Sequence, residues 1–143
     1  MSNNFHRICT IKYGEYYILK CDISKFFASI DQDILKSKLK RKIKDEDALD
    51  ILFKIIDSEE QGLGIGNMTS QIFAIFYLND MDHFIKEQLK IKYYVRYQDN
   101  FLLFHPSKDY LKYCFKEIEK FLEKEKLKLN KKSRIYKNTN YML

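Results

Sequence analysis

The chain has 143 residues, of which 45% are hydrophobic, and it contains 11 phenylalanines and 11 tyrosines. This composition excludes a disordered polypeptide, and the length indicates one domain with its own core. The three cysteines stand singly and the histidines share no metal-ligand spacing, which argues against a disulfide framework or a zinc site. The longest fully apolar run, 72–78, is too short to span a bilayer, and we recognise no signal peptide. We therefore expect a cytoplasmic protein with no membrane partner.

Positive charge falls in two groups along a chain whose net charge is +6. The first occupies residues 36–44 and consists of Lys36, Lys38, Lys40, Arg41, Lys42 and Lys44. The second extends from Lys108 to Lys137. Such groups favour a polyanionic partner, nucleic acid first. Solvated helix faces are the alternative, since glutamates interleave with the second group.

The first half of the chain predicts one strand and two helices, after an N-terminal segment, 1–15, that we leave unassigned. From residue 16 the alternation of side chains predicts a strand whose core face is Tyr17, Leu19, Cys21 and Ile23. Ile18, Lys20 and Asp22 then face the other way. Ser29 and Gln32 have the spacing of a capping box for a basic helix that continues to residue 43. A second helix is predicted from about Asp47 to Asp57, with an inward face of Leu49, Leu52, Phe53 and Ile56.

A glycine-rich loop, GLGIGNMTSQ at residues 62–71, precedes a third predicted helix that runs to about Lys90. Its core face is Phe73, Tyr77, Met81, Phe84, Ile85 and Leu89. Glycine at alternate positions lets another backbone or a flat ligand approach closely. A loop that delivers a helix N-terminus is suited to contact a nucleotide. The alternative is a plain linker between two helices.

The second half predicts a β-hairpin, a helix and a final strand. Aromatic runs at 93–97 and 101–104 flank Gln98-Asp99-Asn100, which suits a tight turn. Ser107 is suited to cap a helix whose inward residues are Leu111, Phe115, Ile118 and Leu122. A short strand is expected near 134–136. This order predicts an α+β fold with helices on one face of a sheet, in which the Asp22 strand lies beside the hairpin.

Asp22 and Asp99 are candidate metal ligands. If their strands pair, both carboxylates project at the same edge of the sheet. Hard oxygen ligands with room for phosphates suit Mg²⁺. Two such ions, about 3.5–4 Å apart, can activate an attacking hydroxyl and stabilise a leaving pyrophosphate. Each residue also has an ordinary explanation, since Asp is common both at the end of a strand and in a tight turn.

Four segments resemble, in chain order, the motifs of reverse transcriptase palm domains. KCDISKFFASID at 20–31 resembles the first catalytic motif, and residues 62–71, continuing to 77–78, resemble the template- and nucleotide-contacting motif. YVRYQDN at 94–100 resembles the Tyr-x-Asp-Asp hairpin, and KLNKKS at 128–133 resembles the following palm motif. The resemblance covers roughly residues 16–137. It implies a palm domain over 16–143, a ferredoxin-like antiparallel sheet with helices on one face, which we expect to lack fingers and thumb.

The glycine loop narrows the resemblance further. An aliphatic residue before Gly66 and Ser70-Gln71 after it are most similar to the bacterial and phage reverse transcriptases of diversity-generating retroelements. Retron and group II intron-like enzymes are relatives. The resemblance implies an RNA-directed DNA polymerase that uses two Mg²⁺ ions, with Mn²⁺ as a substitute. Its partners would be an RNA template, a DNA primer and deoxynucleoside triphosphates.

The resemblance also implies roles for individual residues. Asp22, Asp99 and Asn100 stand at catalytic positions, and the metal ligands would be Asp22, Asp99 and the Ile23 carbonyl. Phe27 would be the steric gate that excludes a ribose 2′-hydroxyl, with a core aromatic as the alternative. The nascent base pair would be lined by Ile65, Gly66 and Gln71. Lys131 and Lys132 are weaker candidates for protonating the pyrophosphate, with solvated lysines as the alternative.

Departures from the family pattern put the activity of this chain in doubt. Asn100 is a neutral amide where the family has a carboxylate, which should weaken a Mg²⁺ site. Gly64 replaces the usual proline. We expect a partial enzyme whose fingers and thumb come from a separate polypeptide or accessory protein. The alternatives are a catalytically inactive palm-fold module that binds nucleic acid or assembles with other polymerase parts, and another two-metal enzyme such as a nucleotide cyclase.

Overall fold

The computed structural model describes residues 12–64 and 68–138. Their elements follow in the order β1 (Tyr17–Asp22), α2 (Phe26–Ser29), α3 (Gln32–Lys42), α4 (Glu46–Asp57), α5 (Met68–His83), the π-helix η1 (Phe84–Gln88), β2 (Tyr93–Tyr97), β3 (Asn100–His105), α6 (Lys108–Lys124) and β4 (Arg134–Lys137). No helix in the described ranges is long and apolar enough to cross a membrane.

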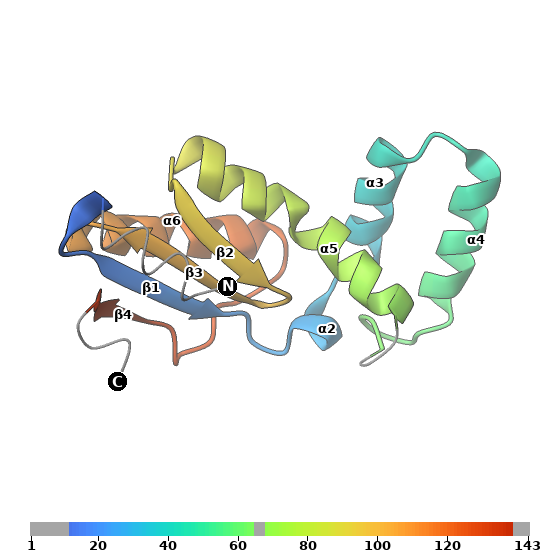
Figure 1. The fold of residues 1–143 in the computed structure, drawn as a ribbon. Coiled ribbons are helices and arrows are strands. Elements are labelled where there is room, and N and C mark those ends of the chain that lie inside the picture. Colours follow the sequence, from blue (N-terminus) through green and yellow to red (C-terminus); the bar gives the residue numbers. More distant parts are fainter. Residues whose placement is uncertain (1–11, 65–67, 139–143) are drawn as a thin grey trace.

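The four strands form one antiparallel sheet in the order β2-β3-β1-β4. The helices between β1 and β2 form one crossover and α6 forms the other, which gives the β-α-β-β-α-β connectivity of ferredoxin-like folds. Figure 1 shows α6 behind the sheet, with β4 at its lower edge. The predicted α+β fold with an antiparallel sheet is confirmed, including the pairing of β1 with the hairpin strand β3.

One face of the sheet carries the main core. On this face lie Leu19 and Cys21 of β1 with their β3 partners Leu103 and Phe101, all at most 1% exposed. They pack against the buried face of α6, Leu111, Cys114, Ile118 and Leu122, and against Met81 and Ile85 at the end of α5 and in η1. The alternation predicted for β1 therefore holds, and it directs Lys20 and Asp22 to the opposite face.

The opposite face is covered at one end only. At the covered end, Ile18 points away from the main core and is fully buried in a second, small cluster with Tyr16 and Phe104. Tyr13 packs edge-on against Tyr93 beside this cluster, with ring centroids 5.9 Å apart. The other end of this face, where β1 ends, carries polar and charged side chains. This end faces the helical part made of α2 to α5 (Figure 1).

The start of α3 differs from the prediction. The capping residue is Asp31, whose Oδ1 accepts a hydrogen bond from Ile34 N–H at 2.9 Å, and not Ser29. Ser29 instead closes the short helix α2, and Ile30 is extended between the two helices. Gln32 does not cap either. Its Nε2 donates to the carbonyls of Glu59 and Gly62, each at 3.0 Å, and so ties the glycine loop to α3.

Two other helices differ in detail. The helix α4 begins one residue earlier than predicted because Asp45 caps it by accepting from the N–H groups of residues 47 and 48. Of its four expected core residues only Ile56 is fully buried, and the other three are half-buried. The long third helix becomes a π-helix at Phe84, whose carbonyl accepts from Leu89 N–H. Its predicted core face is buried except for Phe84, which is half-buried and stacks on Phe121.

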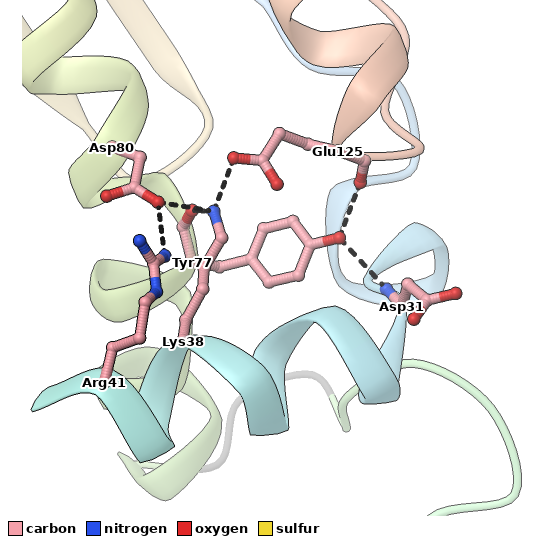
Figure 2. Close-up of polar contacts among 6 residues, drawn as sticks. All are labelled: Asp31, Lys38, Arg41, Tyr77, Asp80 and Glu125. Carbon is pink, nitrogen blue, oxygen red and sulfur yellow. Dashed lines mark hydrogen bonds and ion pairs between the residues drawn. The ribbon is translucent and has the colours of Figure 1, made fainter. Parts of the chain in front are cut away.

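A buried lysine joins the helical part to the sheet part (Figure 2). Lys38 of α3 is 6% exposed, and its Nζ lies 2.7 Å from the Tyr77 carbonyl and 2.5 Å from Glu125 Oε1. The Tyr77 hydroxyl donates to the Glu125 carbonyl and accepts from Asp31 N–H. Glu125 follows α6, so these bonds connect α3 and α5 to the helix that covers the sheet.

Candidate active site

Strand pairing brings Asp22 and Asp99 together. Asp22 is the last residue of β1 and pairs with Asn100, the first residue of β3. Beyond that pair, Ile23 N–H donates to the Asp99 carbonyl at 3.0 Å, so the hairpin turn lies against the end of β1. Partial burial raises the pKa of the Asp22 carboxyl, and the charge of Asp99 and a hydrogen bond with it raise that pKa further. The two carboxylates are thus direct neighbours at one end of the sheet.

An arginine braces the turn that carries Asp99. Arg96 donates from Nε and Nη2 to the two carboxylate oxygens of Asp82, each at 2.7 Å, and from Nη1 to the Gln98 carbonyl at 2.9 Å. Gln98 has a left-handed backbone with φ +55°. Tyr94 also donates to Asp82, from its hydroxyl group. This brace was not predicted from the sequence. The available signal was Arg96 itself, a charged residue in a strand of tyrosines and one valine.

The segment after α6 holds Asp22 from the other side. Asn130 N–H donates to the Asp22 carbonyl at 2.6 Å, and Asn130 Nδ2 lies 3.5 Å from Asp22 Oδ2. Ser133 Oγ accepts from Asp22 N–H at 3.4 Å. Both residues lie in the KLNKKS segment, but neither was singled out from the sequence. They fix the backbone and the side chain of Asp22 at the sheet end.

Asp22 lines an open cavity of about 450 Å³ on the face of the sheet away from α6. Its other lining residues include Lys20, Asn100, Lys132 and Arg134. The positive charges of Lys132 and Lys20 oppose the effects of burial and of Asp99, and so limit the rise in the pKa of Asp22. The cavity therefore places the carboxylate of Asp22, which can hold a cation together with its neighbour Asp99, beside basic side chains that can face phosphates.

A family model described as reverse transcriptase (RNA-dependent DNA polymerase) matches residues 2–142. The chain belongs to the reverse transcriptase family. A search of curated proteins found no match. This identification is coarser than the resemblance to retroelement enzymes, because the match does not separate subfamilies.

Solved telomerase structures share the fold of this reverse transcriptase chain. Apo telomerase from Candida tropicalis superposes with a TM-score of 0.72 at 16% identity, covering 94% of this chain and 30% of that one. The same enzyme truncated from its C-terminal domain gives 0.70 at 17% identity and covers 94% and 34%. Candida albicans telomerase in complex with a telomeric RNA fragment gives 0.67 at 18%, covering 94% and 29%. The chain thus spans about a third of the length of these structures.

Of the four residues expected to contact the nucleotide, the structure describes two, Phe27 and Gln71. Phe27 is half-buried in α2 and packs edge-on against Phe26, with centroids 5.2 Å apart. Its carbonyl accepts from Leu63 N–H at 2.8 Å, which joins α2 to the glycine loop. Gln71 is exposed in the first turn of α5. The predictions for residues 65 and 66 fall outside the described residues.

The close backbone approach expected of the glycine loop occurs at Gly62. Its φ is +62°, and a Cβ there would lie 2.3 Å from the Phe27 carbonyl oxygen and 2.7 Å from that of Ala28. Only glycine fits such a position. The contact is with another backbone segment, so it explains one glycine of the motif by packing.

The two lysine candidates separate in the structure. Lys132 lines the cavity of Asp22, whereas Lys131 lines a different cavity of about 310 Å³ beside Glu119 and Glu123. Both side chains are exposed. Lys132 is therefore the one that can reach a ligand held by Asp22.

Asn100 lies beside the two carboxylates with an exposed side chain, and its Nδ2 lies 3.4 Å from Asp99 Oδ1. It thus presents a neutral donor at this point. Among the described residues there is no group of three or more Asp, Glu, His or Cys side chains that could hold a metal. Asp22 and Asp99 form the carboxylate pair of the site, with the Ile23 carbonyl as the expected third oxygen.

Three of the six cations of the first basic group are neutralised within the fold. Lys36 pairs with Asp57 at 2.5 Å and Arg41 with Asp80 at 2.9 Å, while Lys38 is buried. Burial on its own would raise the pKa of Asp80, but the hydrogen bond from Arg41 and the charge of Lys38 hold that pKa below its usual value. These three cations are therefore committed to acidic side chains of the same fold.

Proposed function

We propose that the chain is the palm of an RNA-directed DNA polymerase that transfers deoxynucleotides to a primer 3′-hydroxyl at Asp22 and Asp99. The observation that carries this proposal is the juxtaposition of two like charges at the sheet end, with the raised pKa of Asp22 as its electrostatic signature. Two crowded carboxylates are stabilised by a cation between them. Their hard oxygen atoms fit Mg²⁺, or Mn²⁺ in its place.

Bound divalent ions would activate the 3′-hydroxyl of the primer as the nucleophile and stabilise the leaving pyrophosphate. The chain's own residues would do the rest. Asn130 and Ser133 hold Asp22, and Arg96 holds the turn of Asp99. Lys20 and Lys132 would face the phosphates in the shared cavity.

The nucleotide contacts are proposed from the motifs alone. Phe27 would exclude the ribose 2′-hydroxyl, and Ile65, Gly66 and Gln71 would line the base pair. The substrates would be an RNA template, a DNA primer and deoxynucleoside triphosphates. By its Ser70-Gln71 motif we assign the chain to the enzymes of diversity-generating retroelements, in a bacterial or phage-infected cytoplasm. A separate polypeptide would supply fingers and thumb.

Asn100 favours a second candidate, a palm-fold module without turnover that binds nucleic acid or assembles with polymerase parts. An amide contributes no negative charge to a metal site, so the ions would bind weakly. The two candidates differ in one measurable quantity, the affinity of the Asp22–Asp99 site for metal.

The test is a set of thermal melts with chelator and with millimolar Mg²⁺ or Mn²⁺. We expect Asn100→Asp to increase the metal-induced shift in melting temperature, because a ligand bound only by the folded state stabilises it. At a metal concentration ten times the Kd the gain is about 1.4 kcal/mol, or roughly 3–5 °C for a chain of this size. Asp22→Asn in the same background should abolish the shift.

Gln88→Glu is the matched control, since it adds one negative charge at an exposed position of η1. A parallel primer-extension assay on an RNA template should show little synthesis by the parent chain and metal-dependent addition by Asn100→Asp. If Asn100→Asp and Gln88→Glu respond equally to metal, residue 100 does not reach the ions and the polymerase proposal fails at its site. A larger shift without any synthesis would favour the non-catalytic module.

A further inference from the structure

A second cavity lies on the other side of the sheet, between α6 and β4. It has a volume of about 440 Å³, and its lining contains both apolar and basic side chains. Its apolar floor includes Phe115 and Ile135, which are both half-buried. Its basic rim consists of Lys108, Lys112 and Lys116 of α6. Arg134 lines this cavity as well, but it pairs with Lys20, so its side chain belongs to the opposite face of the sheet. We call this feature the α6–β4 cleft.

Lys108, Lys112 and Lys116 follow one another at intervals of four residues on α6. They therefore form one row, in which neighbouring lysines are about 6 Å apart along the helix axis. All three are exposed, and none forms an ion pair with any acidic side chain of the described residues. Like charges four apart on a helix destabilise it by about 0.2–0.5 kcal/mol per pair. The row thus differs from Lys36, Lys38 and Arg41 of the first basic group, which are paired within the fold.

The floor of the cleft ends at a free sheet edge. In the strand order β2-β3-β1-β4, β4 has β1 as its neighbour on one side and no strand of the described residues on the other. Half of the backbone N–H and C=O groups of an edge strand point outward and can pair with another chain. Figure 1 shows β4 as a short strand at the margin of the sheet.

We propose that the α6–β4 cleft binds an extended, acidic segment of a partner protein, which adds a fifth strand to β4. Alternate residues of such a strand point toward α6 at intervals of about 6.6–6.8 Å, close to the spacing of the lysine row. Glutamates at these positions would lay their methylene groups over Phe115 and Ile135 and their carboxylates against the lysines. Main-chain hydrogen bonds to β4 would supply the affinity, and the charges the selectivity.

A nucleic acid strand fits the cleft less well. Its phosphates could meet the lysines and a base could stack on Phe115, but a sugar–phosphate backbone cannot continue the β-ladder at β4. The proposal is also independent of the polymerase assignment, since the cleft lies on the α6 side of the sheet and Asp22 faces away from α6.

The experiment uses a fluorescein-labelled eight-residue peptide of alternating glutamate and valine, titrated with the protein and followed by fluorescence anisotropy. We expect saturable binding, weakened about tenfold by Lys112→Glu, because the substitution removes an attraction and adds a repulsion of similar size. Lys124→Glu makes the same charge change at an exposed position of α6 outside the cleft and should leave binding unchanged. Far-UV circular dichroism confirms that both variants are folded.

Two N-methylated peptides test the strand itself. Methyl groups on alternate backbone nitrogens block one edge of an extended peptide and leave the other free. One of the two peptides should lose at least tenfold in affinity and the other should bind like the parent. The proposal is overturned if the parent peptide does not bind up to about 1 mM, or if both methylated peptides bind equally. It is also overturned if Lys112→Glu weakens binding of a labelled oligothymidylate and not of the peptide.

Discussion

Lys38→Met tests the contact that joins the helical part to the sheet part (Figure 2). Methionine keeps the length and apolar stem of the side chain but removes its charge. In the parent chain Lys38 Nζ reaches Glu125, Asp80 and the Tyr77 carbonyl at 2.5, 3.5 and 2.7 Å. The variant leaves Glu125 without its cation, and the side chain of Glu125 is only 12% exposed.

Removing one partner of a buried ion pair destabilises a protein by about 3–5 kcal/mol. The loss of stability caused by Lys38→Met should fall slightly below that range. Asp80 is 32% exposed and keeps Arg41, and Glu125 retains some access to water. We therefore expect Lys38→Met to lower the free energy of unfolding by about 2–4 kcal/mol, which moves the urea midpoint by about 1–2 M.

The assay is urea unfolding followed by far-UV circular dichroism, with Lys36→Met as the control. Lys36 lies on the same helix and pairs with Asp57, which is 59% exposed, so its loss should change stability by less than about 1 kcal/mol. Adding Glu125→Gln to Lys38→Met should recover part of the loss. If the two methionine variants lose the same stability, the burial of Lys38 does not determine its contribution.

Two further predictions concern the glycine loop and Asp22. Gly62→Ala should lower the free energy of unfolding by about 2–5 kcal/mol, since strain at φ +62° adds to the clash with Phe27. Gly14→Ala, at φ +70° in open space, should lose only about 1–2 kcal/mol in the same urea experiment, and equal losses would show that the loop moves away. Asp22→Asn should raise the free energy of unfolding at pH 7 without metal by roughly 1 kcal/mol, because it removes a charge crowded against Asp99. Folding raises the pKa of Asp22, so ionisation of this carboxyl destabilises the fold as pH rises. The stability gained by Asp22→Asn should therefore vanish below about pH 4, where Asp22 is protonated in the folded and the unfolded state. A gain that persists there would refute charge repulsion as its cause.

The parts of the fold that could be predicted rest on local patterns. Alternation of side chains predicts β1, and the turn Gln98-Asp99 predicts the hairpin, because both signals lie within a few residues. Ser107 caps α6 as predicted, with its hydroxyl accepting from Tyr110 N–H. The proximity of Asp22 and Asp99 follows from pairing β1 with the hairpin, since the end of β1 then meets the hairpin turn.

The rest depends on partners that are distant in the sequence. Lys38 looks like one of several solvated lysines, and its burial depends on Glu125, 87 residues away. Arg96 finds Asp82 14 residues back, on a different element. The predicted cap of α3 was wrong for a local reason, because Ser29 and Asp31 are both residue types that suit a helix N-cap. In the structure Ser29 ends α2 and Asp31 caps α3.

Asn100 shows that the fold and the chemistry of this site can be separated. Its backbone takes part in the ladder, paired with Asp22 on one side and Tyr97 on the other. Its side chain is exposed, so exchange between an amide and a carboxylate needs no repacking and alters no buried contact. The braces from Arg96, Asn130 and Ser133 act on the neighbouring residues and do not depend on the charge at residue 100. A chain can therefore keep the geometry of a reverse transcriptase palm while the charge available to a metal changes, and on our proposal that charge decides whether the palm turns over.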